Sequence, residues 1–388
     1  MVLSNLLEKA IQVGRLDLIG PDGRRQRFSG AGGPRVAVRL HDPSLPRRIY
    51  FNPDLAIGEA YMEGTLTIEE GTLSDLLELM AANMGSARRD PLYALRDRLA
   101  RLTRRWQQFY PVRLSRRNVA HHYDLPDKLY DLFLDADRQY SCAYFPDGDE
   151  DLERAQMAKK RHLAAKLLLE PGQRVLDIGS GWGGLALYLA RESGTEVTGL
   201  TLSRSQPEVS CRRAAEAGLE GRVRFHLRDY REQQGTFERI VSVGMFEHVG
   251  VNHYRRFFDT IGRLLTEDRV CVLHSIGRMY GPGSTSPWIR KYIFPGGYSP
   301  SLSETLRAWR QRFEANRERI AELLDERFCR MWEYYLVLSE AAFRHGDHYV
   351  FRIQLARRRD TVSLNRNYIT RWEENHPLPL AHEPRRVA

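Results

Sequence analysis

A short strand that runs into a glycine-rich turn and then into a helix is the feature that most constrains the fold of this chain. The strand covers 174–178, the turn is Gly179-Ser-Gly-Trp-Gly-Gly184, and the helix follows over 185–191. In a doubly wound sheet, such a turn after the first strand lies at the carboxyl edge of the strands, where ligands bind. The segment therefore predicts both an α/β fold and a ligand site.

From residue 170 onward, strands alternate with helical stretches. The readable strands are Arg174–Gly179, Glu196–Leu202, Arg222–Leu227, Phe237–Gly244 and Arg269–Ile276. This alternation predicts a parallel sheet that is covered by helices on both faces. We therefore expect an α/β, doubly wound, Rossmann-like sheet in a domain over 121–388.

The glycine-rich turn also indicates the class of ligand. Gly179 and Gly181 let the backbone approach a ligand with no side chain in the way. The turn loosely fits the pattern of a dinucleotide site, but such a site needs an acid after the second strand for the ribose. Residues 201–206, Thr-Leu-Ser-Arg-Ser-Gln, supply none, whereas Asp177 precedes the turn. This arrangement favours an S-adenosylmethionine-dependent methyltransferase over a nicotinamide dehydrogenase.

Residues 1–85 have the pattern of a small mixed α+β domain. Residues 1–11 are predicted to form an amphipathic helix, and 73–81 a second helix. Between Gly14 and Thr67 the chain reads as short strands divided by turns, and Arg48–Phe51 is one of these expected strands.

Residues 86–120 carry many arginines, with Leu99, Leu102 and Trp106 between them at helical spacing. One interpretation is a solvated linker helix, and the other is a basic helix that meets anionic lipid headgroups. The whole chain has a net charge of +9, which suits an anionic membrane face or nucleic acid. No nucleic-acid-binding motif occurs, so we expect a lipid partner and no nucleic acid.

The compartment follows from what the sequence lacks. No stretch of about 18 apolar residues occurs, and the N-terminus has neither the basic start nor the long apolar run of a signal peptide. The four cysteines, Cys142, Cys211, Cys271 and Cys329, show no metal-ligand spacing and no disulfide framework. We therefore expect a cytoplasmic protein with unpaired thiols and no metal.

Several further motifs occur in a fixed order along the chain. They are Tyr140–Phe145, Val175–Gly183, Gly199–Ser203, Gly244–Gly250, Leu273–Ile276 and Lys291–Gly297. Together they resemble the cyclopropane fatty acid synthases, and the likeness extends over nearly the whole chain. A set of motifs in order is far more specific than the glycine-rich turn alone.

The resemblance implies a reaction and a location. The family transfers a methyl group from S-adenosylmethionine to a cis double bond of a phospholipid acyl chain. The resulting carbocation loses a proton to a bound bicarbonate and closes a cyclopropane ring. The implied partner is membrane phospholipid, met by peripheral association at the inner membrane face.

The resemblance also implies site residues. For the cofactor they are Tyr140, Ser141, Asp177, Gly179, Ser180, Gly181, Gly183, Thr201, Leu202, Gln206 and Tyr230. For bicarbonate they are Cys142, Glu247, His274 and the backbone of Ile276. Taken alone, Cys142 reads as a small buried residue and His274 as a core histidine, whereas Glu247 follows a strand at the ligand-binding edge.

After the fifth strand the sequence departs from the family that it resembles. A seven-stranded class I methyltransferase sheet needs two more strands, and only His348–Ala356 is readable. The helix, strand and His-Tyr motif that family members carry are missing at the Glu304–Thr305 junction, so the tyrosine ligand of the bicarbonate has no match. Tyr298 is a candidate replacement. We therefore expect a sheet that is one strand short, an exposed apolar edge and weak catalysis.

Three functions stay open at this point. The first is a cyclopropane synthase, and the second is a methylene- or methyl-branching methyltransferase of the same family. The third is a catalytically weakened homologue that binds lipid and cofactor or that serves as a partner in a homodimer.

Overall fold

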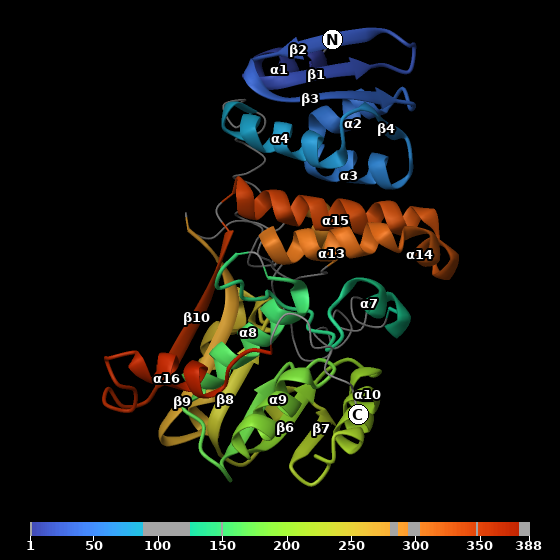
Figure 1. Cartoon of the computed structure of the whole chain (residues 1–388). Helices are drawn as coiled ribbons and strands as arrows, with labels where there is room; N and C mark the ends of the chain where they lie inside the picture. The colour runs from blue at the N-terminus through green and yellow to red at the C-terminus, as the bar shows by residue number, and fades with distance from the viewer. Residues whose placement is uncertain are drawn as a thin grey trace. The chain divides into compact units, whose positions relative to one another are not determined.

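The computed structural model describes residues 2–87, 125–148, 150–279, 286–293, 303–346 and 348–379. These residues form two compact units (Figure 1). The first unit contains the N-terminal residues together with the helices between 286 and 344, and the second contains the large sheet with its helices. No helix in the described residues is long and apolar enough to cross a bilayer.

The first unit is built on a four-stranded sheet of order β2-β1-β3-β4. Its strands are β1 (Val13–Ile19), β2 (Arg25–Ser29), β3 (Ala31–Leu40) and β4 (Leu66–Glu70). Its N-terminal helices are α1 (Val2–Ala10), α2 (Leu45–Phe51), α3 (Pro53–Met62) and α4 (Leu73–Ala87). On β1, Leu16 and Leu18 are buried on one face, whereas Asp17 on the other face pairs with Arg15, Arg25 and Arg27.

The expected strand at Arg48–Phe51 is wrong, because these residues lie in α2. The buried residues of α2 are Leu45 and Ile49, which are four positions apart and therefore on the same side of a helix. Pro46 in the first turn also suits a helix start. The helix expected at 73–81 is confirmed and extends to Ala87.

Four later helices pack in this first unit. They are α12 (Pro287–Tyr292), α13 (Ser303–Ala315), α14 (Arg317–Leu323) and α15 (Glu326–Arg344). Tyr61 of α3 donates to Glu333 of α15 at 2.9 Å, and Lys291 of α12 pairs with Glu59 at 2.6 Å. The segment 121–388 therefore does not pack as one body, because α12 and α15 pack against α3, α15 also packs against α4, and α13 and α14 pack against α15.

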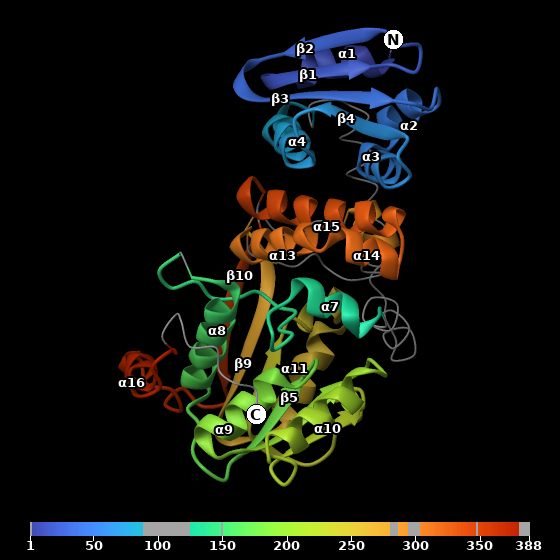
Figure 2. The ribbon, with the colours of Figure 1, turned by 45° about the vertical axis from the view of Figure 1, so that its right-hand side comes forward.

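The second unit contains a six-stranded sheet of order β10-β9-β8-β5-β6-β7 (Figures 1 and 2). Its strands are β5 (Arg174–Ile178), β6 (Glu196–Thr201), β7 (Val223–Leu227), β8 (Phe237–Val243), β9 (Leu265–Arg278) and β10 (His348–Ala356). β5 to β9 pair in parallel. Arg352 contacts His274 whereas Arg358 pairs with Asp268, so β10 runs antiparallel to β9. This is the expected doubly wound α/β fold.

Helices cover both faces of this sheet. On one face, Val175, Val241 and Val272 pack with α8 (Leu152–Leu167) and α9 (Gly184–Ser193). On the other face, Leu176 and Ile240 pack with α11 (Tyr254–Leu264). Neighbouring residues of one strand thus serve opposite cores, as a parallel sheet that is buried on both sides requires. The remaining helices of the unit are α7 (Asp127–Phe133), α10 (Gln206–Glu216) and α16 (Asn367–Asn375).

β10 is the edge strand beside β9, and no seventh strand follows it among the described residues. Val270 to Ile276 of β9 are all buried, whereas no residue of β10 is. Tyr349 and Ile353 of β10 remain 41% and 42% exposed. The exposed apolar edge agrees with the expectation of a missing strand. The Glu304–Thr305 junction lies in the first turn of α13.

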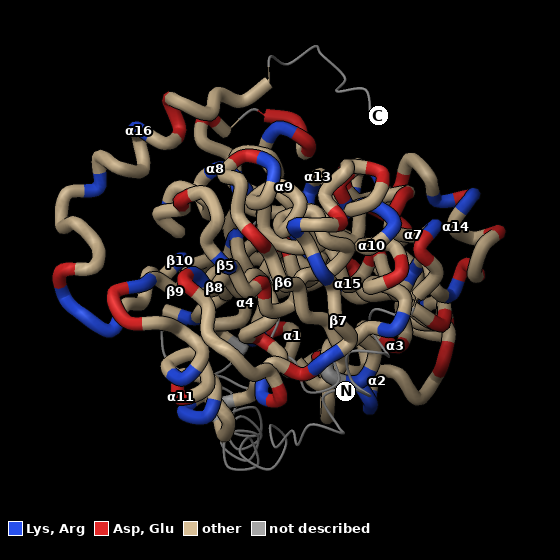
Figure 3. The backbone as a smooth tube through the Cα atoms, turned by 90° about the horizontal axis from the view of Figure 1, so that it is seen from below, with Lys and Arg blue, Asp and Glu red and all other residues tan. Residues whose placement is uncertain are grey.

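Most of the chain's net positive charge belongs to residues 88–120. Along the described chain, Lys and Arg lie among Asp and Glu (Figure 3). Residues 88–120 contain ten arginines, no lysine and two aspartates, a net charge of +8 against +9 for the whole chain. The expected basic helix falls on these residues and, beyond Ala87, lies outside the described part of the chain.

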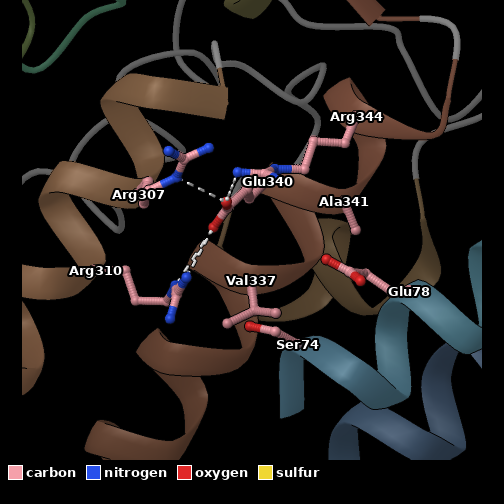
Figure 4. Close-up of a pocket in the computed structure, with 8 residues that line it drawn as sticks. All are labelled: Ser74, Glu78, Arg307, Arg310, Val337, Glu340, Ala341 and Arg344. Atoms are coloured by element: carbon pink, nitrogen blue, oxygen red, sulfur yellow. Dashed lines mark hydrogen bonds and ion pairs between the residues drawn. The ribbon is translucent and has the colours of Figure 1, made fainter. Parts of the chain in front are cut away.

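A pocket in the first unit, with an empty volume of about 410 Å³, is lined by α4, α13 and α15 (Figure 4). Glu340 in this pocket is buried and pairs with Arg307, Arg310 and Arg344 at 3.6, 3.2 and 2.9 Å. Glu78 lines the same pocket and has no ion pair among the described residues. One buried carboxylate therefore holds three guanidinium groups together.

We predict that Glu340→Gln lowers the free energy of unfolding by about 2 kcal/mol, because it leaves three converging cations without their counter-ion. Glu78→Gln in the same pocket is the matched control and should change it by less than about 0.5 kcal/mol. Urea unfolding at pH 7 measures both. Equal effects of the two substitutions would contradict this account of the cluster.

Candidate active site

The glycine-rich turn is fixed to the end of β6. The N–H groups of Gly179 and Ser180 both donate to the carbonyl of Leu200, each at 2.9 Å. Gly179 has a φ of 88°, and a Cβ on it would lie 2.8 Å from Cβ of Met245. Only glycine suits this position, since it combines left-handed backbone with a close approach of the chain after β8. α9 begins directly after the turn at Gly184.

Asp177 at the end of β5 is a buried carboxylate that lacks part of its hydrogen bonding. Its side chain is 1% exposed, and Oδ2 has no hydrogen-bond partner among the described residues. Burial raises the pKa of Asp177 to about 7, although the nearby Lys159 opposes this shift. An unpaired buried carboxylate oxygen is costly and fits a cationic or N–H-donating ligand. The ammonium and sulfonium groups of S-adenosylmethionine meet that requirement.

The loop before α8 brings Tyr140 and Ser141 to the same edge. A Cβ on Gly244, directly after β8, would lie 3.6 Å from Cβ of Ser141. Oγ of Ser141 accepts from Nζ of Lys159 at 2.8 Å, and the ring of Tyr140 lies edge-on to Tyr130 at 5.8 Å. The expected cofactor residues Tyr140 and Ser141 therefore lie beside the strand ends.

The remaining expected cofactor residues follow β6 and β7. Oγ1 of Thr201 donates to Oε1 of Gln206 at 2.5 Å, which closes the loop that contains Leu202. Tyr230 opens a short 3-10 helix after β7, and burial raises its pKa to about 12. The ring of Tyr230 packs edge-on against Phe257 at 5.4 Å. All these residues therefore follow the carboxyl ends of neighbouring parallel strands.

Glu247 and Ile276, two of the expected bicarbonate residues, contact one another. Glu247 lies in a short 3-10 helix after β8, and its Oε1 accepts from the backbone N–H of Ile276 at 2.9 Å. Oε2 is buried with no hydrogen-bond partner among the described residues. Burial raises the pKa of Glu247 to about 7. The Ile276 N–H is thus engaged by Glu247, whereas Oε2 is left available to a ligand.

His274, two positions before Ile276 on β9, is held in one tautomer. Nε of Arg352 donates to Nδ1 of His274 at 3.2 Å. Because a guanidinium can only donate, Nδ1 carries no proton and Nε2 carries it in the neutral ring. Burial, together with Arg352 and Lys159, holds the pKa of His274 well below its ordinary value. The Nε2–H group is a buried donor without a partner in the described residues.

Two cations complete the site and escaped the sequence analysis. Lys159 of α8 is fully buried, and its Nζ donates to Oε1 of Gln139 and Oγ of Ser141, each at 2.8 Å. Burial lowers the pKa of Lys159 to about 7. Cys142, 2% exposed, lies close enough to interact electrostatically with both Lys159 and Arg352. Lysines of an amphipathic helix and an arginine of an edge strand ordinarily face water, so no sequence signal marks them.

The described residues contain no cluster of three His, Cys, Asp or Glu side chains that could hold a metal ion. Tyr298, a candidate ligand from the sequence, lies outside the described residues. The described site is therefore a set of buried polar groups at the carboxyl edge of the sheet, beside a glycine-rich turn. The fold and this site together define a class I S-adenosylmethionine-dependent methyltransferase.

Comparison with known proteins gives the family. The model described as mycolic acid cyclopropane synthetase matches residues 112–304 and 301–353, and a domain of unknown function matches residues 2–91. The chain is 35% identical over 349 residues to the cyclopropane-fatty-acyl-phospholipid synthase of Escherichia coli (strain K12), covering 84% of this chain and 89% of that protein. The chain belongs to this family of cyclopropane synthases. The two ranges that match the family model meet and overlap at residues 301–304, next to the expected Glu304–Thr305 junction.

Two further similarities agree with this assignment. The tuberculostearic acid methyltransferase UfaA1 of Mycobacterium tuberculosis is 33% identical over 395 residues, which cover 92% of this chain and 91% of that protein. The crystal structure of mycolic acid cyclopropane synthase CmaA1 in complex with SAH and CTAB has a TM-score of 0.58 at 31% identity and covers 63% of this chain and 98% of that chain. The chain is an S-adenosylmethionine-dependent methyltransferase of the cyclopropane fatty acid synthase type.

The raised pKa of Glu247 predicts a pH-dependent stability difference. Below pH 4.5 the carboxyl is protonated in both the folded and unfolded states, so burial has little cost. As the pH rises from 4.5 through about 7, the unfolded state loses its proton first and the folded state is destabilised. Glu247→Gln should therefore raise the free energy of unfolding at pH 8 by up to about 3 kcal/mol relative to its effect at pH 4.5.

Urea unfolding of wild type and variant at both pH values measures this difference. The matched control is Glu238→Gln on β8, because Arg174 lowers the pKa of Glu238. Its substitution should reduce stability more at pH 8 than at pH 4.5. A Glu247→Gln effect that is the same at both pH values would contradict the buried, proton-holding carboxyl.

Proposed function

We propose that this protein methylates the cis double bond of unsaturated phospholipid acyl chains and closes a cyclopropane ring. The observation that carries the proposal is a pair of buried polar atoms without partners in the described residues, Oε2 of Glu247 and Nε2 of His274. Glu247 follows β8 and His274 lies on the neighbouring strand β9. Both are at the carboxyl edge of the sheet, where the glycine-rich turn also lies. The relative from E. coli is named for cyclopropane formation on a fatty-acyl phospholipid.

The proposed reaction needs a methyl donor and a proton acceptor. Bound S-adenosylmethionine supplies the methyl group, and bound bicarbonate supplies the proton acceptor. The alkene's π electrons would form the bond to the methyl carbon as the methyl–sulfur bond breaks and S-adenosylhomocysteine leaves, and positive charge would develop on the neighbouring carbon. A proton then leaves the new methyl group, and its C–H electron pair closes the ring, so the acyl chain gains one CH₂ unit.

The residues of the site support each part of this reaction. Asp177 and the turn hold the cofactor, with Tyr140, Ser141, Thr201 and Gln206 around it. An alkene is a weak nucleophile, so reaction requires close positioning in a site that excludes water. Cys142, Glu247 and His274 are all nearly fully buried, which supports such a dry site.

The same groups fit a small anion. The Nε2–H of His274 is an unpaired donor, and Glu247 with a pKa near 7 can donate through Oε2 when it is protonated. Cys142 lies in the same surroundings, close to Lys159 and Arg352. Donors and nearby cations favour the negative charge of bicarbonate.

We further propose that the enzyme reaches its substrate by peripheral association with an anionic membrane face. Residues 88–120 support this, because their net charge of +8 is nearly the charge of the whole chain. A polybasic segment is attracted to anionic lipids by about 1 kcal/mol per basic residue near the surface. The exposed apolar residues Tyr349 and Ile353 offer a further surface at the sheet edge.

A methyl-branching activity is a second candidate. The match to a relative that is named a tuberculostearic acid methyltransferase favours this candidate, because that match covers 92% of this chain. The missing seventh strand, within the described residues, instead favours a homologue of reduced activity. These alternatives share the cofactor site and differ in product.

We predict that the purified protein, incubated with S-adenosylmethionine, bicarbonate and vesicles of unsaturated phospholipid, adds one CH₂ unit to the acyl chains. Mass analysis with fragmentation distinguishes a ring from a branch. Glu247→Gln should lower the rate at least about 100-fold because it removes an ionisable group of the proton-accepting site. It should leave S-adenosylhomocysteine binding intact.

Glu238→Gln serves as the control here also and should keep the wild-type rate, since Glu238 pairs with Arg174 at the opposite, amino end of the strands. Cofactor and vesicle binding without any methylated product would contradict the proposed reaction and support the weakened homologue. A methyl or methylene branch as the product would establish the second candidate.

A further inference from the structure

The pocket lined by α4, α13 and α15 holds more positive charge than its buried carboxylate neutralises. Arg307, Arg310 and Arg344 all pair with Glu340, and none of the three forms another ion pair or side-chain hydrogen bond within the described residues. A guanidinium has five N–H donors, whereas a carboxylate accepts about four hydrogen bonds. One carboxylate therefore leaves most of the donors of three guanidinium groups without a protein partner.

These donors are accessible to a ligand from solution. The side chains of Arg307, Arg310 and Arg344 are 44%, 27% and 33% exposed, whereas that of Glu340 is 8% exposed. The pocket has an empty volume of about 410 Å³, which lies within the range of small-molecule sites, about 300–1,000 Å³. A small ligand can therefore meet the guanidinium groups while Glu340 stays in place beneath them.

The wall of the pocket that α4 contributes has a different character. Ser74 and Glu78 are four positions apart on α4 and so lie on the same side of that helix (Figure 4). Glu78 is partly exposed and has no ion pair or side-chain hydrogen bond among the described residues. Val337 and Ala341 of α15 add a short apolar surface to the same pocket. The pocket thus offers guanidinium donors, a hydroxyl group, apolar contact and one available carboxylate.

We propose that this pocket binds a small zwitterion, a phosphate ester of the phosphoethanolamine class whose other end carries an ammonium group. Guanidinium forks match phosphate oxygens, and a phosphate offers acceptors in several directions, as three converging guanidinium groups require. The ammonium group would pair with Glu78. A phosphate without an ammonium group would instead add negative charge to a pocket in which Glu78 has no cation of its own.

The charges of pocket and ligand agree with this assignment. Three arginines and two glutamates give the pocket a net charge of +1. A phosphate monoester carries about −1.5 to −2 at pH 7, so an ammonium group on the same molecule brings its net charge close to −1. The inference does not rest on the proposed function, because it concerns the first unit and needs no turnover.

Calorimetric titration of the full chain with phosphoethanolamine and with glycerol 3-phosphate tests the proposal. Both compounds have the phosphate ester, but only phosphoethanolamine has the ammonium group. The wild type should bind phosphoethanolamine about 3- to 5-fold more tightly, the gain expected from a partly exposed ion pair. Glu78→Gln should abolish this preference without weakening the binding of glycerol 3-phosphate.

Arg307→Gln should weaken the binding of both compounds about 10-fold, because it removes donors to a charged group. It should unfold at nearly the wild-type temperature, since Glu340 keeps its other two arginines. Arg319→Gln is the matched control and should leave both affinities unchanged. Arg319 lies on α14 in the same unit, is exposed, contacts Asn316 and does not line the pocket.

Two results would overturn the inference: equal affinity of wild type and Arg307→Gln for phosphoethanolamine, or an undiminished preference for phosphoethanolamine in Glu78→Gln. A methylated lipid product without any phosphoethanolamine binding would overturn this inference alone and leave the proposed function standing.

A competition experiment distinguishes a lipid headgroup from a free phosphate ester as the source of the ligand. Vesicles that contain phosphatidylethanolamine in phosphatidylglycerol should displace phosphoethanolamine more than vesicles of phosphatidylglycerol alone if the site takes a lipid headgroup. Equal displacement by the two kinds of vesicle assigns the site to the free ester. Both results support a site for this zwitterion and differ only in its source.

Discussion

The active-site edge depends on one shared carbonyl group. Leu200 at the end of β6 accepts from the N–H groups of both Gly179 and Ser180, so the turn after β5 is fixed to the neighbouring strand. This contact requires left-handed backbone at Gly179 and places Met245, after β8, directly against it. The ends of three parallel strands are thereby set around Asp177. Every other group of the site is positioned relative to this edge.

Burial determines the chemistry that these groups can perform. Asp177, Glu247 and Lys159 each have a pKa moved to about 7, and desolvation is the largest cause in all three. Groups that change protonation near neutral pH are suited to hold charged ligands and to exchange protons. The same burial lowers the free energy of unfolding, because an ionised side chain in the folded protein loses much of its hydration. Arg352, which forms no ion pair within the described residues, adds a further positive charge beside His274.

The sequence predicts the local parts of this architecture well. Glycine spacing and strand–helix alternation indicate the sheet and its turn, and the family motifs mark Glu247 and His274. At Arg48–Phe51 the alternation of apolar and polar residues predicts a strand, but the residues form part of α2, because a helix buries Leu45 and Ile49 on one side. The sequence does not reveal that α12 to α15 pack with the N-terminal residues, because tertiary contacts and not local pattern decide it. Lys159 and Arg352 escape for the same reason.

We propose that the buried, partly protonated carboxyl group of Asp177 receives the cationic cofactor. With a pKa of about 7, Asp177 is about half protonated at pH 7, and a nearby positive charge drives it to ionise. Calorimetry of S-adenosylmethionine binding in buffers of different ionisation enthalpy measures the protons released. We expect release of about half a proton at pH 7 from Asp177, and both a smaller release and weaker binding for Asp177→Asn. Equal proton release and equal affinity for the two proteins would contradict it.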